Sequence, residues 1–201
     1  MFFAGGIIFG GMKDSLRAVW RWVRWPLYVL VVGYVLLVIY DVQRLFDIDK
    51  TNEAVAAIHA QKITLADVQG TNLPPIPDQA ANDATIEGID KNNNGIRDDV
   101  ELAIFKKYPS DKKARGAALQ YASAEQMYLT KVFNTETWKA VAEETGRAGL
   151  CILETETEID WENIQELVAN TQLRKETRTK NFEFITSHGS AGENPCDTAV
   201  N

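Results

Sequence analysis

The stretch WPLYVLVVGYVLLVIY, Trp25–Tyr40, determines the architecture that this chain can adopt. It carries no formal charge, and as an α-helix it would extend about 24 Å. Because the hydrocarbon core of a bilayer is about 30 Å thick, flanking side chains must complete a crossing. Trp20, Trp22, Arg21 and Arg24 can do so, since aromatic rings prefer the interface and long basic side chains reach lipid headgroups. The sequence therefore predicts a single transmembrane anchor over residues 25–40.

The charges on either side of the anchor predict its orientation. The N-terminal flank carries four basic residues and one acid, namely Lys13, Arg17, Arg21, Arg24 and Asp14. By the positive-inside bias, residues 1–24 should be cytoplasmic and the C-terminal domain exported. A cleaved signal peptide is the alternative, but no small-residue cleavage site follows Tyr40. The first eleven residues are apolar and glycine-rich, so Met12 is an alternative start.

The charge of the remaining chain argues against one class of partner. The whole chain has a net charge of −7, and residues 1–24 contribute +3, so the rest carries about −10. Affinity for nucleic acid comes largely from Lys and Arg that neutralise phosphates. We therefore expect no nucleic-acid partner.

The pattern after the anchor predicts a mainly α fold. A juxtamembrane helical stalk is expected over 41–69, and a proline-rich connector over 70–89, where prolines favour extended backbone. Apolar residues at helical spacing predict a head domain over 98–185, followed by a tail over 186–201. Because each apolar face needs a partner, we expect a small antiparallel bundle. Its helices are predicted at Asp98–Tyr108, Ser110–Phe133, Thr135–Glu154 and Asp160–Phe184, the last with a break near Asn170.

The segment DKNNNGIRDDVE, Asp90–Glu101, has the spacing of a calcium loop. Calcium takes six to eight oxygen ligands, and a twelve-residue loop supplies them from positions 1, 3, 5, 7, 9 and 12. Gly95 stands at position 6, where the chain must turn sharply. The sequence thus predicts a Ca²⁺ site at 90–101 with six ligand residues: Asp90, Asn92, Asn94, Ile96 through its carbonyl, Asp98 and Glu101. The alternative is a simple Asn/Gly-rich turn before a helix.

This segment resembles the EF-hand-like loops of exported bacterial proteins, such as dockerins and thrombospondin type 3 repeats. It is also similar to uncharacterised bacterial envelope proteins in which a proline-rich stretch precedes a GIDxNxNGxRDDVE segment. The resemblance covers only Leu73 to about Pro109 and implies calcium ligation, not catalysis. The loop departs from an EF-hand at position 8, where Arg97 replaces an apolar residue. We therefore expect an unpaired structural site, in which Arg97→Ala has little effect on calcium affinity.

Two cysteines are present, and an exported domain encounters oxidising conditions. We therefore predict a disulfide between Cys151, in an expected helix, and Cys196, in the tail. His59 and His188 lack neighbours at zinc-ligand spacing. The glutamates of residues 154–162 fit a solvated helix junction, and the basic run of residues 173–180 fits an exposed helix face.

Three functions follow as hypotheses. The first is a calcium-binding, membrane-anchored structural or interaction protein of the bacterial inner membrane, with its head in the periplasm and an envelope protein as partner. The second is a membrane-tethered hydrolase that uses the carboxylates of residues 154–162 or His188. The third is an accessory subunit of a membrane assembly. The first requires no catalytic residues.

The charge asymmetry around residues 25–40 predicts that Asn201 lies outside the cytoplasm. An alkaline phosphatase fused after Asn201 should be active, because that enzyme matures only after export. A β-galactosidase fused at the same position should be inactive. The opposite pair of activities would show that the orientation is reversed.

Overall fold

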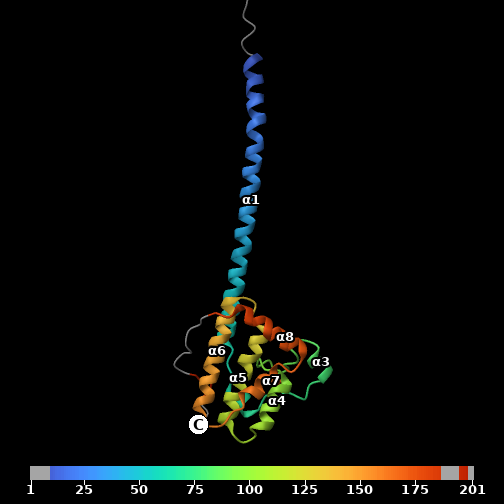
Figure 1. Ribbon diagram of the computed structural model, residues 1–201, viewed down its shortest axis with the longest axis vertical. Coiled ribbons are helices and arrows are strands. Elements are labelled where there is room, and N and C mark those ends of the chain that lie inside the picture. The colour runs from blue at the N-terminus through green and yellow to red at the C-terminus, as the bar shows by residue number, and fades with distance from the viewer. Residues whose placement is uncertain (1–9, 187–194, 199–201) are drawn as a thin grey trace, which may run out of the picture. The chain divides into compact units, whose positions relative to one another are not determined.

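The computed structural model describes residues 10–186 and 195–198, and those residues contain helices and no strand (Figure 1). The predicted mainly α class is confirmed. The elements are α1 (Gly10–Ala60), α2 (Leu65–Gln69), α3 (Gln79–Asp83), α4 (Asp98–Lys107), α5 (Lys112–Thr130), α6 (Thr135–Glu154), α7 (Trp161–Val168), α8 (Gln172–Asn181) and the 3₁₀ turn η1 (Phe182–Phe184). The chain forms two compact units, Met1–Lys50 and Thr51–Asn201.

The first unit consists of the apolar part of α1. The large hydrophobic side chains described in this unit, which begin at Trp20, are exposed, from 39% at Val38 to 84% at Trp22. A helix that is apolar all round is stable only where its surroundings are apolar as well. By length and composition, the part of α1 that starts at Trp22 can span a membrane.

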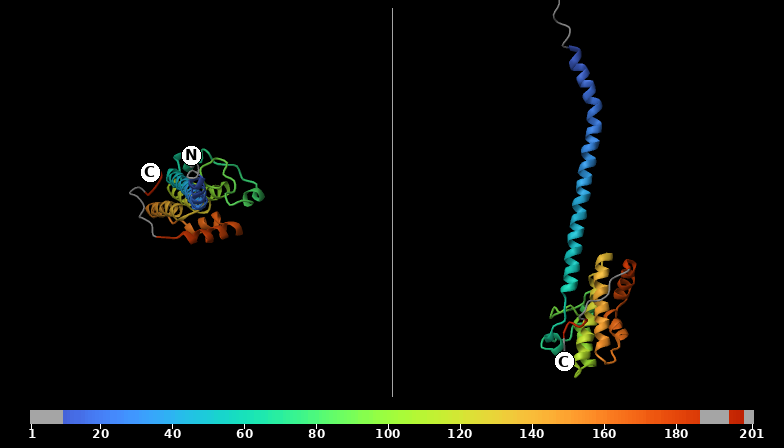
Figure 2. Two further views of the ribbon diagram at one scale, coloured as in Figure 1. Left: turned by 90° about the horizontal axis from the view of Figure 1, so that it is seen from above. Right: turned by 90° about the vertical axis from the view of Figure 1, so that its left-hand side faces the viewer.

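The second unit is organised around α5, which contacts α2, α4, α6, α7 and α8 (Figure 2). Nearly every α5 residue from Ala114 to Met127 is buried. Many of them are small, including Ala117, Ala118 and Ala122, so neighbouring helices can approach closely. The bundle therefore has a central helix rather than a symmetric ring of four.

Side-chain caps fix most helix starts in the bundle. Asp111, Asn134, Asp160 and Thr171 each accept a hydrogen bond from a backbone amide of the first turn. The expected helix Thr135–Glu154 has those bounds in the structure. The expected break near Asn170 is also present, since α7 ends at Val168 and α8 follows the Thr171 cap.

The compact head begins at Thr51, well before the proline-rich segment that was expected to mark its boundary. The last turns of α1 belong to it, because Ile58 is buried and Asn134 donates to Thr51 Oγ1 at 2.9 Å. Thr64 and Asp67 form a capping box that starts α2 and places Val68 in the core beside Gly116. The segment 70–89 is not wholly extended, since it contains α3.

The second unit is closed covalently. Cys151 near the end of α6 and Cys196 form a disulfide, as predicted, with an Sγ–Sγ distance of 2.03 Å. The segment around Cys196 is also held by polar contacts: the Ile63 amide donates to Asp197 Oδ2 at 2.9 Å, and Arg147 Nη1 lies 2.6 Å from Asp197 Oδ1. This part of the predicted tail is therefore part of the head.

Removing the disulfide should destabilise the head strongly. The cysteines are 45 residues apart, and closing such a loop is worth about 4 kcal/mol in the chain-entropy model. The double variant Cys151→Ser/Cys196→Ser should lose about that free energy of unfolding in urea titration. Wild type treated with reductant should match it. Thiol labelling of both cysteines in denatured, non-reduced wild type would contradict the prediction.

Candidate functional site

The loop at residues 90–101 is shaped by two residues with positive φ, Asn93 at 56° and Gly95 at 81°. A side chain at 95 would also displace the side-chain amide of Gln61, because an added Cβ would collide with it. Gln61 crosses the loop and donates to Ser123 Oγ of α5 at 3.0 Å. The loop is therefore packed between the end of α1 and the central helix.

Its own side chains hold the loop closed. Asp90 accepts the amides of Asn94 and Gly95 at 3.2 and 2.8 Å, and Asn94 Oδ1 accepts the amide of Ile96 at 2.9 Å. The Asp98 amide donates to the Ile89 carbonyl at 2.8 Å, and Asp98 Oδ1 accepts from the Lys91 amide at 2.9 Å. Asp98 begins α4 and Glu101 ends its first turn, so the loop leads directly into that helix.

Two carboxylates of the loop are buried and incompletely paired. Asp98 and Glu101 have no exposed surface, and neither Asp98 Oδ2 nor Glu101 Oε1 has a hydrogen-bond partner among the described residues. Burial raises the pKa of Asp98 and raises that of Glu101 to about 7. Such oxygens are costly to bury without a partner. Their chemistry fits a hard cation, which prefers carboxylate and amide oxygens.

The other expected ligands surround these carboxylates with mixed orientations. Asn92 directs its amide nitrogen at Glu101 Oε2, at 3.0 Å, and also donates to the Asn72 carbonyl. No three His, Cys, Asp or Glu side chains in the described part of the chain group closely enough to hold a metal. A cation here would thus depend on amide oxygens, and Asn92 would have to turn its oxygen toward it.

Arg97 has a structural role that its position in the calcium-loop pattern does not predict. Its side chain is fully buried, and its guanidinium donates to the carbonyls of Val168 and Leu167 at 3.0 and 2.7 Å. Nε also donates to Asp99 Oδ1 at 2.5 Å. Gly88, with φ of 66°, leaves room for the Arg97 stem, because a Cβ at 88 would strike it. Arg97 therefore connects the loop to the C-terminal end of α7, where a cation is favoured by the helix dipole.

A second buried arginine was missed because it lies in a run expected to be exposed. Arg174 of α8 has no exposed surface and donates to the carbonyls of Asn82, Thr85 and Ile86 at 2.5, 2.9 and 3.1 Å. It thereby fixes the segment that precedes the loop. Arg174 follows the Thr171 cap by three residues, which places it in the first turn of the helix. The sequence does not show which side of that turn is buried.

The weaker candidates do not join this site. His59, near the end of α1, places its Nδ1 2.9 Å from Glu144 Oε1 of α6. His188 lies outside the described residues. The glutamates at 154, 156, 158 and 162 are all exposed. Within the described residues, none of these groups contacts the loop.

Comparison of the chain with protein families, with characterised proteins and with solved structures finds no match.

The Arg97 contacts predict a large effect of its substitution on stability. Arg97→Met removes the guanidinium and leaves two carbonyls and Asp99 without a buried partner, so the head should lose about 3 kcal/mol. Lys107→Met is the matched control, because its ion pair with Asp160 is exposed and should be worth under about 1 kcal/mol. Equal urea midpoints for the two variants would contradict the role given to Arg97.

Proposed function

We propose that this protein is a membrane-anchored structural or interaction protein of the bacterial envelope whose exported head binds one calcium ion in the loop 90–101. The observation that carries the proposal is the pair of buried oxygens, Asp98 Oδ2 and Glu101 Oε1, that lack a partner among the described residues. They stand at loop positions 9 and 12, where a calcium loop uses carboxylates. Calcium would supply the positive charge that these groups lack.

The six residues named from the sequence would hold the ion: Asp90, Asn92, Asn94, the Ile96 carbonyl, Asp98 and Glu101. Three carboxylates and neutral amide oxygens suit calcium better than magnesium, which requires a tighter octahedron and gives up its water reluctantly. Extracellular calcium modules commonly bind at about 10⁻⁴ to 10⁻³ M, and we expect that range or somewhat tighter.

The role of the ion would be to rigidify the head. The loop packs against Gln61, which bonds to α5, and its own Arg97 bonds to the end of α7. Neutralising its carboxylates would stabilise the start of α4 and both of these connections. This is a structural use of calcium, and it supports a head that presents a fixed surface to another envelope protein.

The membrane side of the proposal rests on the apolar part of α1 and on the disulfide. A helix able to span a bilayer fits a single-pass anchor in the inner membrane. A disulfide in the head fits an oxidising compartment, hence the periplasm, and the basic residues before the anchor favour the same orientation.

A hydrolase is the alternative function, and it requires a cleft in which acidic groups meet. The glutamates at 154, 156 and 158 are exposed and do not line the cavity of about 610 Å³ between α5, α6, α7 and α8. Glu162 lines a separate hollow with Glu166, and none of the other three glutamates joins it there. The geometry therefore favours the structural role over the catalytic one.

Calcium should raise the melting temperature of the fragment Asp47–Asn201. At a tenfold excess over the dissociation constant the stabilisation is about 1.4 kcal/mol, and magnesium should give much less. Glu101→Gln should lose the calcium response yet melt no lower than wild type without calcium, because burial already raises the pKa of Glu101 and disfavours its charge. Calorimetry of both proteins, with and without each ion, measures these effects.

The control is Glu87→Gln, which removes an exposed carboxylate close to the loop in sequence but outside the six expected ligands. It should keep the wild-type response to calcium. If wild type shows no heat of binding and no change in melting temperature at millimolar calcium, the loop is only a turn.

A further inference from the structure

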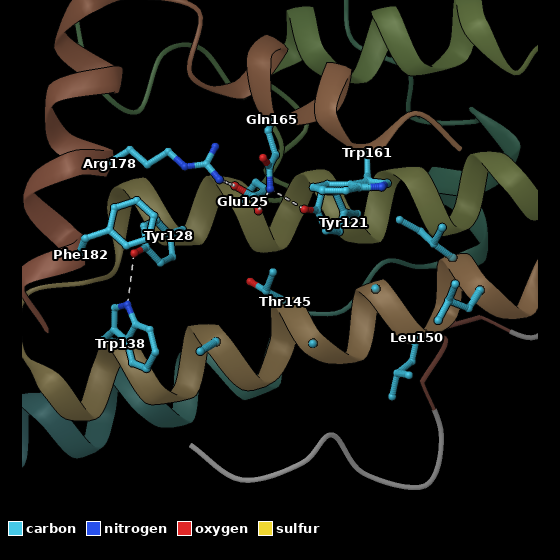
Figure 3. A pocket seen from close by; sticks show the side chains of 15 residues that line it. Tyr121, Glu125, Tyr128, Trp138, Thr145, Leu150, Trp161, Gln165, Arg178 and Phe182 are labelled. Atoms are coloured by element: carbon cyan, nitrogen blue, oxygen red, sulfur yellow. Dashed lines mark hydrogen bonds and ion pairs between the residues drawn. The ribbon is translucent and has the colours of Figure 1, made fainter. Parts of the chain in front are cut away.

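The head contains a cavity of about 610 Å³ between α5, α6, α7, α8 and η1 (Figure 3). This volume lies within the range of about 300 to 1,000 Å³ that is usual for small-molecule sites. The cavity is separate from the calcium loop, which shares none of its lining residues. The proposed calcium role therefore does not explain it.

Five of the fifteen residues that line the cavity are aromatic. Trp138, Tyr128 and Phe182 gather at one end, and Tyr121 and Trp161 at the other (Figure 3). Between them, two glycines of α6, Gly146 and Gly149, line the cavity. The space above each is open, because an added Cβ would have no heavy atom within 4 Å. A flat apolar group could thus lie against α6 with rings at both ends.

A polar cluster lies on the opposite side from α6. Glu125 is 5% exposed and accepts from Gln165 Nε2 at 3.2 Å, while Gln165 also donates to Tyr121 Oη at 2.7 Å. Arg178 Nη2 lies 3.1 Å from Glu125 Oε2. Within the described residues, Nε and Nη1 of Arg178 donate no hydrogen bond, and that side chain is 24% exposed. The cavity therefore has one cation with unused donors.

The charges of this cluster favour an anionic ligand over a cationic or a neutral one. A cationic ligand would meet Arg178, and the only carboxylate in the cluster is already paired with that arginine. An anionic oxygen could accept a charge-assisted hydrogen bond from the unused guanidinium donors. A neutral ligand would gain only the apolar contacts.

We propose that this cavity binds a small carboxylic acid with an apolar, ring-bearing body, its rings between the aromatic side chains and α6 and its carboxylate on Arg178. Burial of an apolar body accounts for the aromatic lining, and the guanidinium accounts for the polar end. The proposal is independent of calcium binding.

The test uses the full chain in phospholipid nanodiscs, with empty nanodiscs as the blank, and three probes that share one ring system. These are 2-naphthoate, 2-naphthalenemethanol and the ammonium ion of 2-naphthylmethylamine. Saturation-transfer NMR and calorimetry should show naphthoate binding at least about tenfold more tightly than either other probe. Absence of binding of naphthoate up to about 1 mM would overturn the proposal, and so would equal or tighter binding of the ammonium probe.

Two variants locate the site. Gly149→Leu adds a side chain to the cavity lining at a position where a Cβ would meet no heavy atom within 4 Å, and it improves helix propensity. The protein should therefore stay folded while all naphthoate binding is lost. Gly149→Ala adds one carbon atom and should keep most binding. Arg178→Gln should lower naphthoate affinity to that of the alcohol and leave alcohol binding unchanged, which shows that the cavity is intact. Wild-type naphthoate affinity in Gly149→Leu or in Arg178→Gln would place binding elsewhere.

Discussion

The constraint on which the head depends is the burial of two carboxyl groups at the start of α4. Asp98 and Glu101 have no exposed surface, and each has one oxygen without a hydrogen-bond partner among the described residues. An isolated buried charge costs several kcal/mol unless it is paired. The N-terminus of α4 supplies some positive potential, and Asn92 and the Lys91 amide supply two hydrogen bonds. The proposed calcium ion would supply the rest.

Two buried arginines connect the loop and the segment before it to other helices through hydrogen bonds. Arg97 joins the loop to the last carbonyls of α7, and Arg174 joins the segment around α3 to the start of α8. Each donates to two or more backbone carbonyls as well as to side chains, so both help to fix the path of the chain. Together with the disulfide, they tie parts of the head that are distant in sequence.

Local patterns in the sequence predicted much of this arrangement. The bounds of α6, a helix start near Asp160, the break near Asn170 and the cysteine pair all depend on spacing or composition, and the structure has each of them. The roles of Arg97 and Arg174 depend on which carbonyls meet them from 70 or more residues away, and one sequence does not contain that information. The start of the head was also missed, because prolines suggested a linker whereas Ile58 and Val68 are held by tertiary packing. The residue types of the expected ligands could be predicted from the sequence. The orientation of Asn92, whose amide nitrogen donates to Glu101, could not.

Hydrogen–deuterium exchange of the full chain, with calcium and with a chelator, tests the central claim most directly. If calcium satisfies the buried carboxylates, exchange should slow at the amides of residues 90–101. It should slow also at the end of α7, because Arg97 connects the two segments. The Glu101→Gln variant should show neither change. Equal exchange in residues 90–101 with and without calcium would contradict the account.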